Sequence, residues 1–215
     1  MGLYRPFQTL SDTCKNTDVL GIPRFKELLR RFLFDHENPD SEQPGDAVSL
    51  QDCPHIASSA RIHLFNHAIS TYYAPSEIHS TNGMHRDLLR CNPRWFHGKG
   101  RYDTCLVQID DGAVGLASMI PARILSCFSF LEWFEYEDDS PDPITGMWIV
   151  QPEFNEHNQK ACGVIPIDSI VRSVHLVGVC EQITMPRDHD YRDSLDAFSR
   201  FYVNWYSDYH AHEVL

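Results

Sequence analysis

The stretch ARILSCFSFLEWFEY (Ala122–Tyr136) contains two short strand-like segments in immediate succession, and it decides the fold prediction. The first segment is rich in Ile, Leu and Phe, and the second carries Trp133, Phe134 and Tyr136. Apolar and aromatic runs this short are typical of strands rather than helices. Similar runs lie on either side: DTCLVQI before it, and MWIVQPEF and GVIPIDSIVRSVHLVGV after it, the last interrupted by one turn at IDSIV. Short strands separated by turn signals predict a small, mostly antiparallel β-barrel or sandwich over residues 102–182.

Helices are expected on both sides of this barrel, which makes the predicted class α+β. GIPRFKELLRRFLFD has apolar side chains at helical spacing, and so has the closing segment, with Leu195, Phe198 and Trp205 in helical register. MHRDLLR predicts a further short helix, whereas ARIHLFNHAIS fits either a strand or a short buried helix. The expected organisation is as follows: an irregular segment 1–21, a helical and loop lead-in 22–101 that packs on the barrel, the barrel 102–182, and a C-terminal helix 183–215.

Composition narrows the class of protein. Hydrophobic residues make up 42% of the chain and charged residues 22%, which is enough for a folded core. No apolar run approaches the length of a membrane span, and the N-terminus has no secretory signal pattern. The seven cysteines are scattered without a CxxC pair, which favours reduced thiols over a disulfide framework or a zinc knuckle. These features predict a nuclear or cytoplasmic protein that is not secreted and has no membrane partner.

Several segments, taken in order, resemble the C-terminal region of fungal transposon-encoded proteins of the Plavaka type, which are relatives of DDE transposases. The segments are CPHIASSARIHLFNHAISTYYAPSEI, GMHRDLLRCNPRWFHGKGRYDTCLVQ, DPITGMWIVQPEF, IPIDSIVRSVHLVGV and SLDAFSRFYVNWYSDYHAHE. The series covers almost all of residues 22–213, and its order is more specific than any single segment. In that family the catalytic carboxylates lie in a separate upstream domain. The resemblance therefore implies a non-catalytic C-terminal module of a transposon-derived protein.

A second resemblance concerns architecture alone. YDTCLVQ, ARIL, LEWFEY, MWIV and IPIDSIVRSVHLV follow the order of strands in bromo-adjacent homology (BAH) domains, which are small β-barrel modules that bind chromatin proteins. It implies interaction with chromatin proteins or with another transposon-encoded protein. Compared with the transposon family, this chain lacks a hairpin between Phe130 and Leu131. The missing hairpin fits a decayed copy, a mis-spliced gene model or a shortened barrel, and in each case we expect unpaired backbone groups beside the junction.

Basic and aromatic residues alternate in the segment before the barrel. Its cations are Arg86, Arg90, Arg94, Lys99 and Arg101, with Trp95 between them. Guanidinium and ammonium groups contact phosphates, and aromatic rings stack on bases, so the segment is a candidate nucleic-acid interface. This gives the alternative function, an accessory DNA-contacting domain of a transposase. The competing interpretation is structural: the arginines pair with the acidic loop at residues 135–142, and the core contains Met84, Leu88, Leu89 and Trp95.

Four aromatic residues form a second candidate site beside that acidic loop: Trp133, Phe134, Tyr136 and Trp148. Aromatic faces next to carboxylates bind cationic side chains, including methylated lysine, so this set is a candidate peptide-binding site. The competing interpretation is strand alternation, in which two of Trp133, Phe134 and Tyr136 face the barrel core.

No residue pattern indicates catalysis, a cofactor or a small-molecule substrate. GxSxG, GxGxxG, HExxH and P-loop motifs are absent from the sequence. His210 and His212 would share one face of a strand but are split by a helix, which is the predicted conformation, so no metal site is expected. Four aspartates are too far apart in the sequence to support a carboxylate site: Asp103, Asp110, Asp168 and Asp208. The chain is therefore predicted not to be an enzyme.

Overall fold

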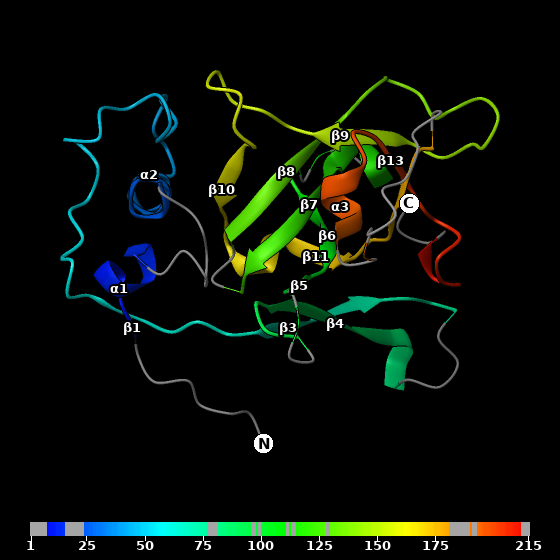
Figure 1. The fold of residues 1–215 in the computed structure, drawn as a ribbon, viewed down its shortest axis with the longest axis horizontal. Helices are drawn as coiled ribbons and strands as arrows, with labels where there is room; N and C mark the ends of the chain where they lie inside the picture. The colour runs from blue at the N-terminus through cyan, green and yellow to red at the C-terminus, as the bar shows by residue number, and fades with distance from the viewer. Residues whose placement is uncertain are drawn as a thin grey trace.

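Antiparallel strands are the main regular structure of the chain after residue 60, as seen in Figure 1. This computed structural model describes residues 8–15, 24–76, 81–95, 98, 100–110, 112, 115–127, 130–180, 190 and 193–211. The helices are α1 (Leu10–Lys15), α2 (Phe25–Glu37) and α3 (Ser194–Ala197). The strands outside the main sheet are β1 (Gln8–Thr9), β2 (Arg61–Ile62), β3 (His67–Tyr73), β4 (Met84–Asn92) and β5 (Arg101–Tyr102).

The main sheet has eight strands and curls into a half-barrel, which confirms the α+β class with mostly antiparallel strands. Its strands are β6 (Thr104–Gln108), β7 (Met119–Ser126), β8 (Phe130–Tyr136), β9 (Ile149–Pro152), β10 (Cys162–Val164), β11 (Ile170–Ser173), β12 (Leu176–Gly178) and β13 (Phe201–Val203). The order is β11-β6-β7-β8-β9-β13-β12, with β10 also paired to β8. Each run of sequence predicted to contain strands contains at least one.

The junction between Phe130 and Leu131 lies inside the hydrogen-bonded sheet. Phe130 pairs with Ser126 of β7 on one side and Val164 of β10 on the other, and both junction residues are fully buried. Farther along, β8 exchanges its β10 neighbour for β9. The expectation of unpaired backbone groups beside the junction is therefore wrong, because β10 supplies the neighbour.

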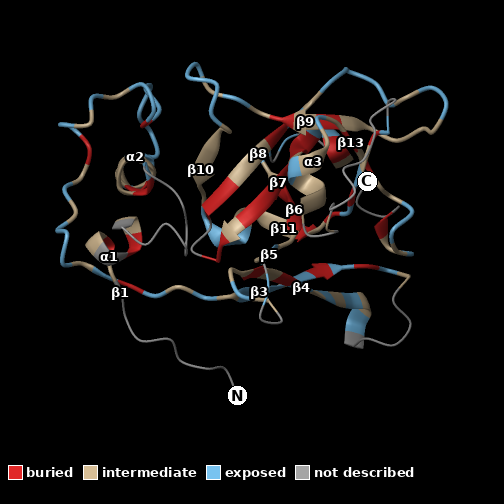
Figure 2. Ribbon diagram, in the orientation of Figure 1, coloured by how far each residue is buried: buried red, intermediate tan, exposed pale blue. Residues whose placement is uncertain are grey.

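Three apolar clusters hold the parts together, and Figure 2 shows buried residues concentrated in the central strands. The first fills the half-barrel around Phe134, Val150 and Phe201. The second joins Leu89 and Cys91 of β4 to the outside of β6, β7 and β8. The third packs α1 and α2 against the start of β8.

The second cluster also brings two cysteines into contact. The Sγ atoms of Cys91 and Cys127 lie 2.6 Å apart in the buried interior, although 36 residues separate them in the chain. Cys105 is fully buried nearby, and burial raises the pKa of its thiol far above the ordinary range. Sequence spacing alone gave no sign of this contact.

The segment Met84–Asn92 forms a strand, so the prediction of a helix at MHRDLLR is wrong. It pairs with β3 over seven residues, from His67 opposite Arg90 to Tyr73 opposite Met84. Met, Leu and Arg are good helix formers, but tertiary pairing overrides propensity in so short a segment. With β5 these strands form a separate three-stranded sheet, which lies below the half-barrel in Figure 1.

Both ends of the chain also depart from expectation. Residues 8–15 form β1 and α1 where the sequence predicts an irregular segment, and Leu10 is fully buried. The predicted C-terminal helix is limited in the described residues to the four residues of α3 and one helical position at Ala211. Phe201–Val203 joins the main sheet between β9 and β12, because this aromatic and β-branched run fits a sheet as well as a helix. None of the helices in the described ranges has the length and apolarity to cross a membrane.

Candidate functional site

The outward-facing side of β3 and β4 is a mixed basic and apolar surface, which we call the outer face. Strand alternation puts eight side chains on it: His67, Ile69, Thr71, Tyr73, Met84, Arg86, Leu88 and Arg90. Tyr73 is 63% exposed, Ile69 51% and Leu88 42%. Arg86 lies opposite Thr71, between the Tyr73–Met84 pair and the Ile69–Leu88 pair. A cation is thus flanked by exposed apolar side chains on both sides.

The inward-facing side of the same sheet fixes its position on the half-barrel. Asp87 accepts hydrogen bonds from the backbone N–H of Ser173, at 3.1 Å, and from its hydroxyl, at 2.7 Å. The Ser70 hydroxyl donates to the carbonyl of Val171. Leu89 is buried in the second apolar cluster. Polar anchors and apolar packing thus hold the inner side against the half-barrel, and the outer face is turned to solvent.

A buried arginine of the half-barrel, Arg172, also holds this sheet in place, and it was not predicted from the sequence. Arg172 is only 2% exposed, and its guanidinium carbon lies 4.8 Å from the ring centre of Tyr72 on β3. The same group is ion-paired with Asp208 near the C-terminal end. Arg172 therefore links β11, β3 and the C-terminal segment.

Two arginines at the edge of the outer face share one tryptophan and one carboxylate. The guanidinium carbons of Arg90 and Arg101 lie 5.6 Å and 5.3 Å from the Trp95 ring centre. Asp103 accepts a bond of 2.8 Å from Arg101 Nε and lies 3.6 Å from Arg90 Nη1. One carboxylate cannot neutralise two guanidinium groups. This corner therefore keeps excess positive charge beside an aromatic ring.

The structure brings together three of the five predicted basic residues. Arg86 and Arg90 share the outer face, and Arg101 lies beside Arg90 on β5. Arg94 is exposed after the end of β4, and Lys99 lies outside the described residues. Among the described residues, Arg86 and Arg94 have no ion pair.

The competing prediction that these arginines pair with the acidic loop is wrong for every described member of the set. Arg90 and Arg101 pair with Asp103, outside that loop. The Glu137 carboxylate of the loop lies 3.0 Å from Arg200.

The four predicted peptide-binding aromatics do not form one cage. Phe134 is 3% exposed and meets Phe201 edge-on, with ring centres 5.7 Å apart. Tyr136 donates its hydroxyl to the carbonyl of Met119 and packs edge-on against Trp148 at 5.2 Å. Burial raises the pKa of the Tyr136 phenol far above its ordinary value. These three rings pack on the first apolar cluster, whereas Trp133 packs on the second.

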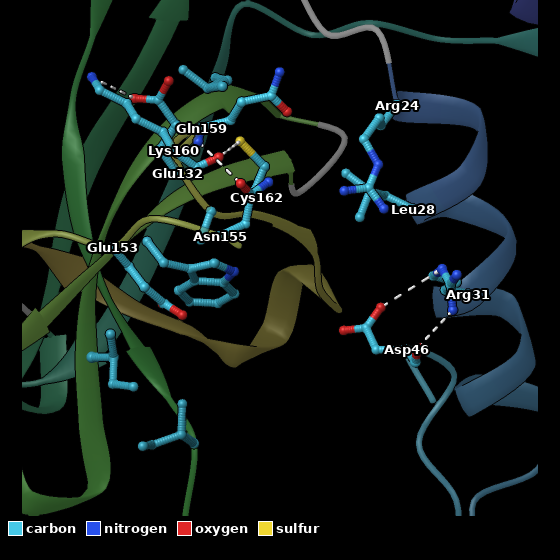
Figure 3. A pocket seen from close by; sticks show the side chains of 15 residues that line it. Arg24, Leu28, Arg31, Asp46, Glu132, Glu153, Asn155, Gln159, Lys160 and Cys162 are labelled. Atoms are coloured by element: carbon cyan, nitrogen blue, oxygen red, sulfur yellow. Dashed lines mark hydrogen bonds and ion pairs between the residues drawn. The ribbon is translucent and has the colours of Figure 1, made fainter. Parts of the chain in front are cut away.

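Trp133 lines a cleft between α2 and the edge of the half-barrel, shown in Figure 3. The cleft has a volume of about 830 Å³. Its helix side carries Arg24 and Arg31, and its sheet side carries Glu153 and Lys160. Both ionic and apolar groups line this cleft, so it is the second candidate site of the molecule.

Nearly all ionic groups of the cleft have partners. Glu27 of α2 accepts hydrogen bonds from Arg24 at 2.7 Å and from Arg31 at 3.2 Å, and the bond from Arg24 is the main cause that lowers the pKa of this carboxyl. Lys160 Nζ lies 2.6 Å from Asp196 Oδ1. Glu153 is the exception, because its carboxylate has no hydrogen-bond or ion-pair partner among the described residues. Partial burial, and then the nearby charge of Glu135, raise its pKa.

The described histidines and carboxylates do not assemble a metal site, since no group of three potential ligands converges in the described ranges. His210 Nδ1 lies 2.8 Å from the Ser76 hydroxyl, and its ring centre is 4.8 Å from that of His85. His79, His97, His212 and Glu213 lie outside the described residues. Asp103 and Asp208 are each engaged with arginines in separate places.

Comparison with known proteins identifies no relative of this chain. No family model matches the chain, and no curated protein and no solved structure matches it.

Proposed function

We propose that this chain is a non-catalytic module of a transposon-derived protein, and that it contacts nucleic acid through the outer face of β3 and β4 together with Arg94 and Arg101. The observation that carries the proposal is the position of Arg86, exposed and without an ion pair in the described structure, between apolar pairs on this sheet. The transposon origin is supported by the ordered resemblance of sequence segments. The nucleic-acid role is supported by the chemistry of the face.

The local chemistry of the outer face favours this ligand. The formal net charge of −12 opposes non-specific binding of nucleic acid by the surface as a whole, so a contact has to depend on the guanidinium groups of this face. Arginine suits phosphate because its planar group donates two parallel hydrogen bonds. Tyr73 offers an exposed ring on which a base can stack, at the same face as Arg86. Sheet faces that combine exposed aromatic and basic residues are a recurring platform for single strands.

The test is retention of a labelled oligonucleotide, as single strand and as duplex, over a series of salt concentrations. We expect the unaltered chain to bind, with affinity falling as salt rises. The double variant Arg86→Ala, Arg94→Ala removes two exposed cations that have no ion pair to lose. The logarithmic salt slope should fall by about 0.9 per lost phosphate contact on duplex and about 0.7 on a single strand.

The matched control removes two cations from elsewhere on the surface, Lys26→Ala and Arg61→Ala. It should leave binding and slope unchanged. Equal losses of oligonucleotide binding in both double variants would show that any surface cation contributes to binding. The outer face would then not be the binding site. No binding by the unaltered chain at low salt would end the proposal. Metal-dependent cleavage of the oligonucleotide would contradict the non-catalytic part alone.

A second candidate function is protein interaction, as the BAH-like strand order implies. The observation that favours it is the cleft beside α2, where Trp133 and the unpaired Glu153 lie together. A partner with basic side chains, such as a chromatin protein, fits a carboxylate beside an aromatic ring. An array of histone-tail peptides that shows no binding would remove the chromatin version of this candidate.

A further inference from the structure

The cleft beside α2 has a preorganised pair of side chains at its sheet side. Three backbone hydrogen bonds place Trp133 next to Glu153: Glu153 N–H to the Trp133 carbonyl at 3.0 Å, Ala161 N–H to the Glu153 carbonyl at 2.7 Å, and Trp133 N–H to the Ala161 carbonyl at 3.0 Å. These bonds join β8 to both arms of the hairpin that contains residues 153–161. The two side chains that line the cleft are therefore set side by side by the backbone.

The indole of Trp133 is also fixed from behind by β10. A Cβ atom placed on Gly163 would come within 2.6 Å of Trp133 Nε1, so the ring lies directly against the strand backbone. Any larger residue at this position would force the ring to move. The glycine thus leaves room for the indole against β10, where the ring contributes to the cleft.

Glu153 lacks the counter-ion that the other ionic groups of the cleft have. Arg24 is paired with Glu27, Arg31 with Glu27 and Asp46, and Lys160 with Asp196 and Glu132. A carboxylate that is partly removed from water and close to a second acid is costly to keep ionised. A cation entering the cleft would remove this cost and gain attraction from the aromatic ring at the same time.

The rest of the lining identifies what should carry this cation. Ile109, Ile120 and Leu125 line the same cleft and offer apolar contact to an alkyl stem. Lysine and arginine side chains combine such a stem with one terminal positive charge. A free polyamine fits less well, because its additional charges would meet Arg24, Arg31 and Lys160, which also line the cleft.

From this arrangement we propose that the cleft binds a lysine or arginine side chain of a protein partner, with Glu153 as counter-ion and the Trp133 indole as cation–π surface. This inference rests on the second candidate function and gives it a defined site and ligand class. It is independent of the outer face, which lies on a different sheet. Neither Phe134, Tyr136 nor Trp148 takes part, because these rings pack on the other apolar cluster.

The test follows the Trp133 indole N–H signal by NMR during titration with blocked tripeptides. The probes are Ala-Lys-Ala, Ala-Arg-Ala and Ala-norleucine-Ala, each acetylated and amidated, so the third keeps the stem and loses the charge. We expect the two cationic peptides to shift this signal and to bind about tenfold more tightly than the norleucine peptide. Equal binding of all three would overturn the proposal, because the charge would then contribute nothing.

Two pairs of variants test the residues. Glu153→Gln should weaken the cationic peptides by about tenfold, whereas Glu156→Gln in the same hairpin should not, because that exposed carboxylate does not line the cleft. Trp133→Phe should weaken them by about threefold, whereas Trp148→Phe should not. For the Trp133 variant, binding is followed by the backbone signals of Glu153 and Lys160. A spectrum with the dispersion of the unaltered protein shows that each variant remains folded.

The outcomes separate this site from the function on which it rests. If cationic peptides bind equally well to Glu153→Gln, the interaction lies elsewhere on the chain. That result would overturn this site but not the protein-binding function. Peptides that bind nowhere on the chain, at millimolar concentration, would overturn both. Oligonucleotide binding should be the same in Glu153→Gln and the unaltered chain, since the outer face keeps its arginines.

Discussion

Two groups of residues that the sequence marks as candidate sites, or that lie beside one, have opposite surroundings. On β8 and just before β9, Phe134, Tyr136 and Trp148 pack on the interior of the half-barrel. On β3 and β4, Tyr73 and Arg86 point to solvent. Both groups lie on or directly beside antiparallel strands, so strand geometry alone does not separate them. What differs is whether a second layer covers the side of the sheet on which they lie.

The largest expected effect is on the covered side. Phe134→Ala should lower the free energy of unfolding by about 3–5 kcal/mol, because it leaves a cavity against Phe201 in the tightest part of the core. Denaturant titration measures this directly. Tyr73→Ala on the outer face is the matched comparison and should change stability little. A similar loss in both variants would mean that the outer face is covered in solution.

A middle-sized effect is expected where the two sheets are joined. Asp87→Ala removes the acceptor for both the N–H and the hydroxyl of Ser173, and should cost about 1–3 kcal/mol. The neighbouring Arg86→Ala, one residue away on the opposite side of β4, should have no comparable effect. If Arg86→Ala were the more costly of the two, the assignment of inner and outer sides would be wrong.

The outer-face arginines should affect binding far more than stability. Arg86→Ala with Arg94→Ala should change the free energy of unfolding by less than about 0.5 kcal/mol per site, as is usual for exposed positions. The same variant should bind oligonucleotide more weakly, as described above. Thermal unfolding of the variant beside its salt titration checks both statements. A large loss of stability would mean that these arginines contribute to the packed structure, as Phe134 and Tyr136 of β8 do.

The smallest effect concerns Glu153 and has the opposite sign. Its pKa is raised in the folded protein, so the folded state holds this proton more tightly than the unfolded chain. The charged carboxylate therefore lowers stability above the folded-state pKa, and this penalty disappears as pH falls below the unfolded-state value. Glu153→Gln should slightly raise stability at neutral pH, and the difference should shrink on acidification. Denaturant midpoints at a series of pH values test this, and a destabilised variant at neutral pH would contradict it.

The sequence predicted the antiparallel strands of the half-barrel, although as a barrel or sandwich, because these strands carry strong local signals. β6, β7, β8 and β9 are apolar and aromatic runs bounded by turns, and each appears where a strand was expected. The strand at MHRDLLR escaped prediction because Met84 and Leu88 have the four-residue spacing of a helix, and no alternation of apolar and polar residues marks the strand. The pairing with β3 decides in favour of the strand. The seven residues of MHRDLLR alone do not show that β3 is available as a partner.

The candidate sites were predicted as residue sets rather than as surfaces. The basic set was found, but Tyr73, Ile69 and Leu88 were not, although their alternation with inward residues is visible once β3 and β4 are known. Glu153 was missed because its distinguishing property is the lack of a partner, which depends on where residues distant in the chain lie. Trp133 was grouped with Phe134, its immediate neighbour, yet the two pack on different clusters.

The pairing of β3 with β4, with Arg86 opposite Thr71, has a consequence for the sign of the surface charge. Side chains alternate between the two sides of a strand, so arginines occupy one parity of β4 and Asp87 the other. A shift of β4 by a single residue would turn Arg86 and Arg90 toward the half-barrel and present Asp87 to solvent. The solvent side of β4 would then carry one carboxylate and neither of these arginines, so it would no longer attract phosphate. Whether a β4 residue lies at an odd or an even position thus decides the charge of the outer face. The length of the connection between β3 and β4 helps to fix this register.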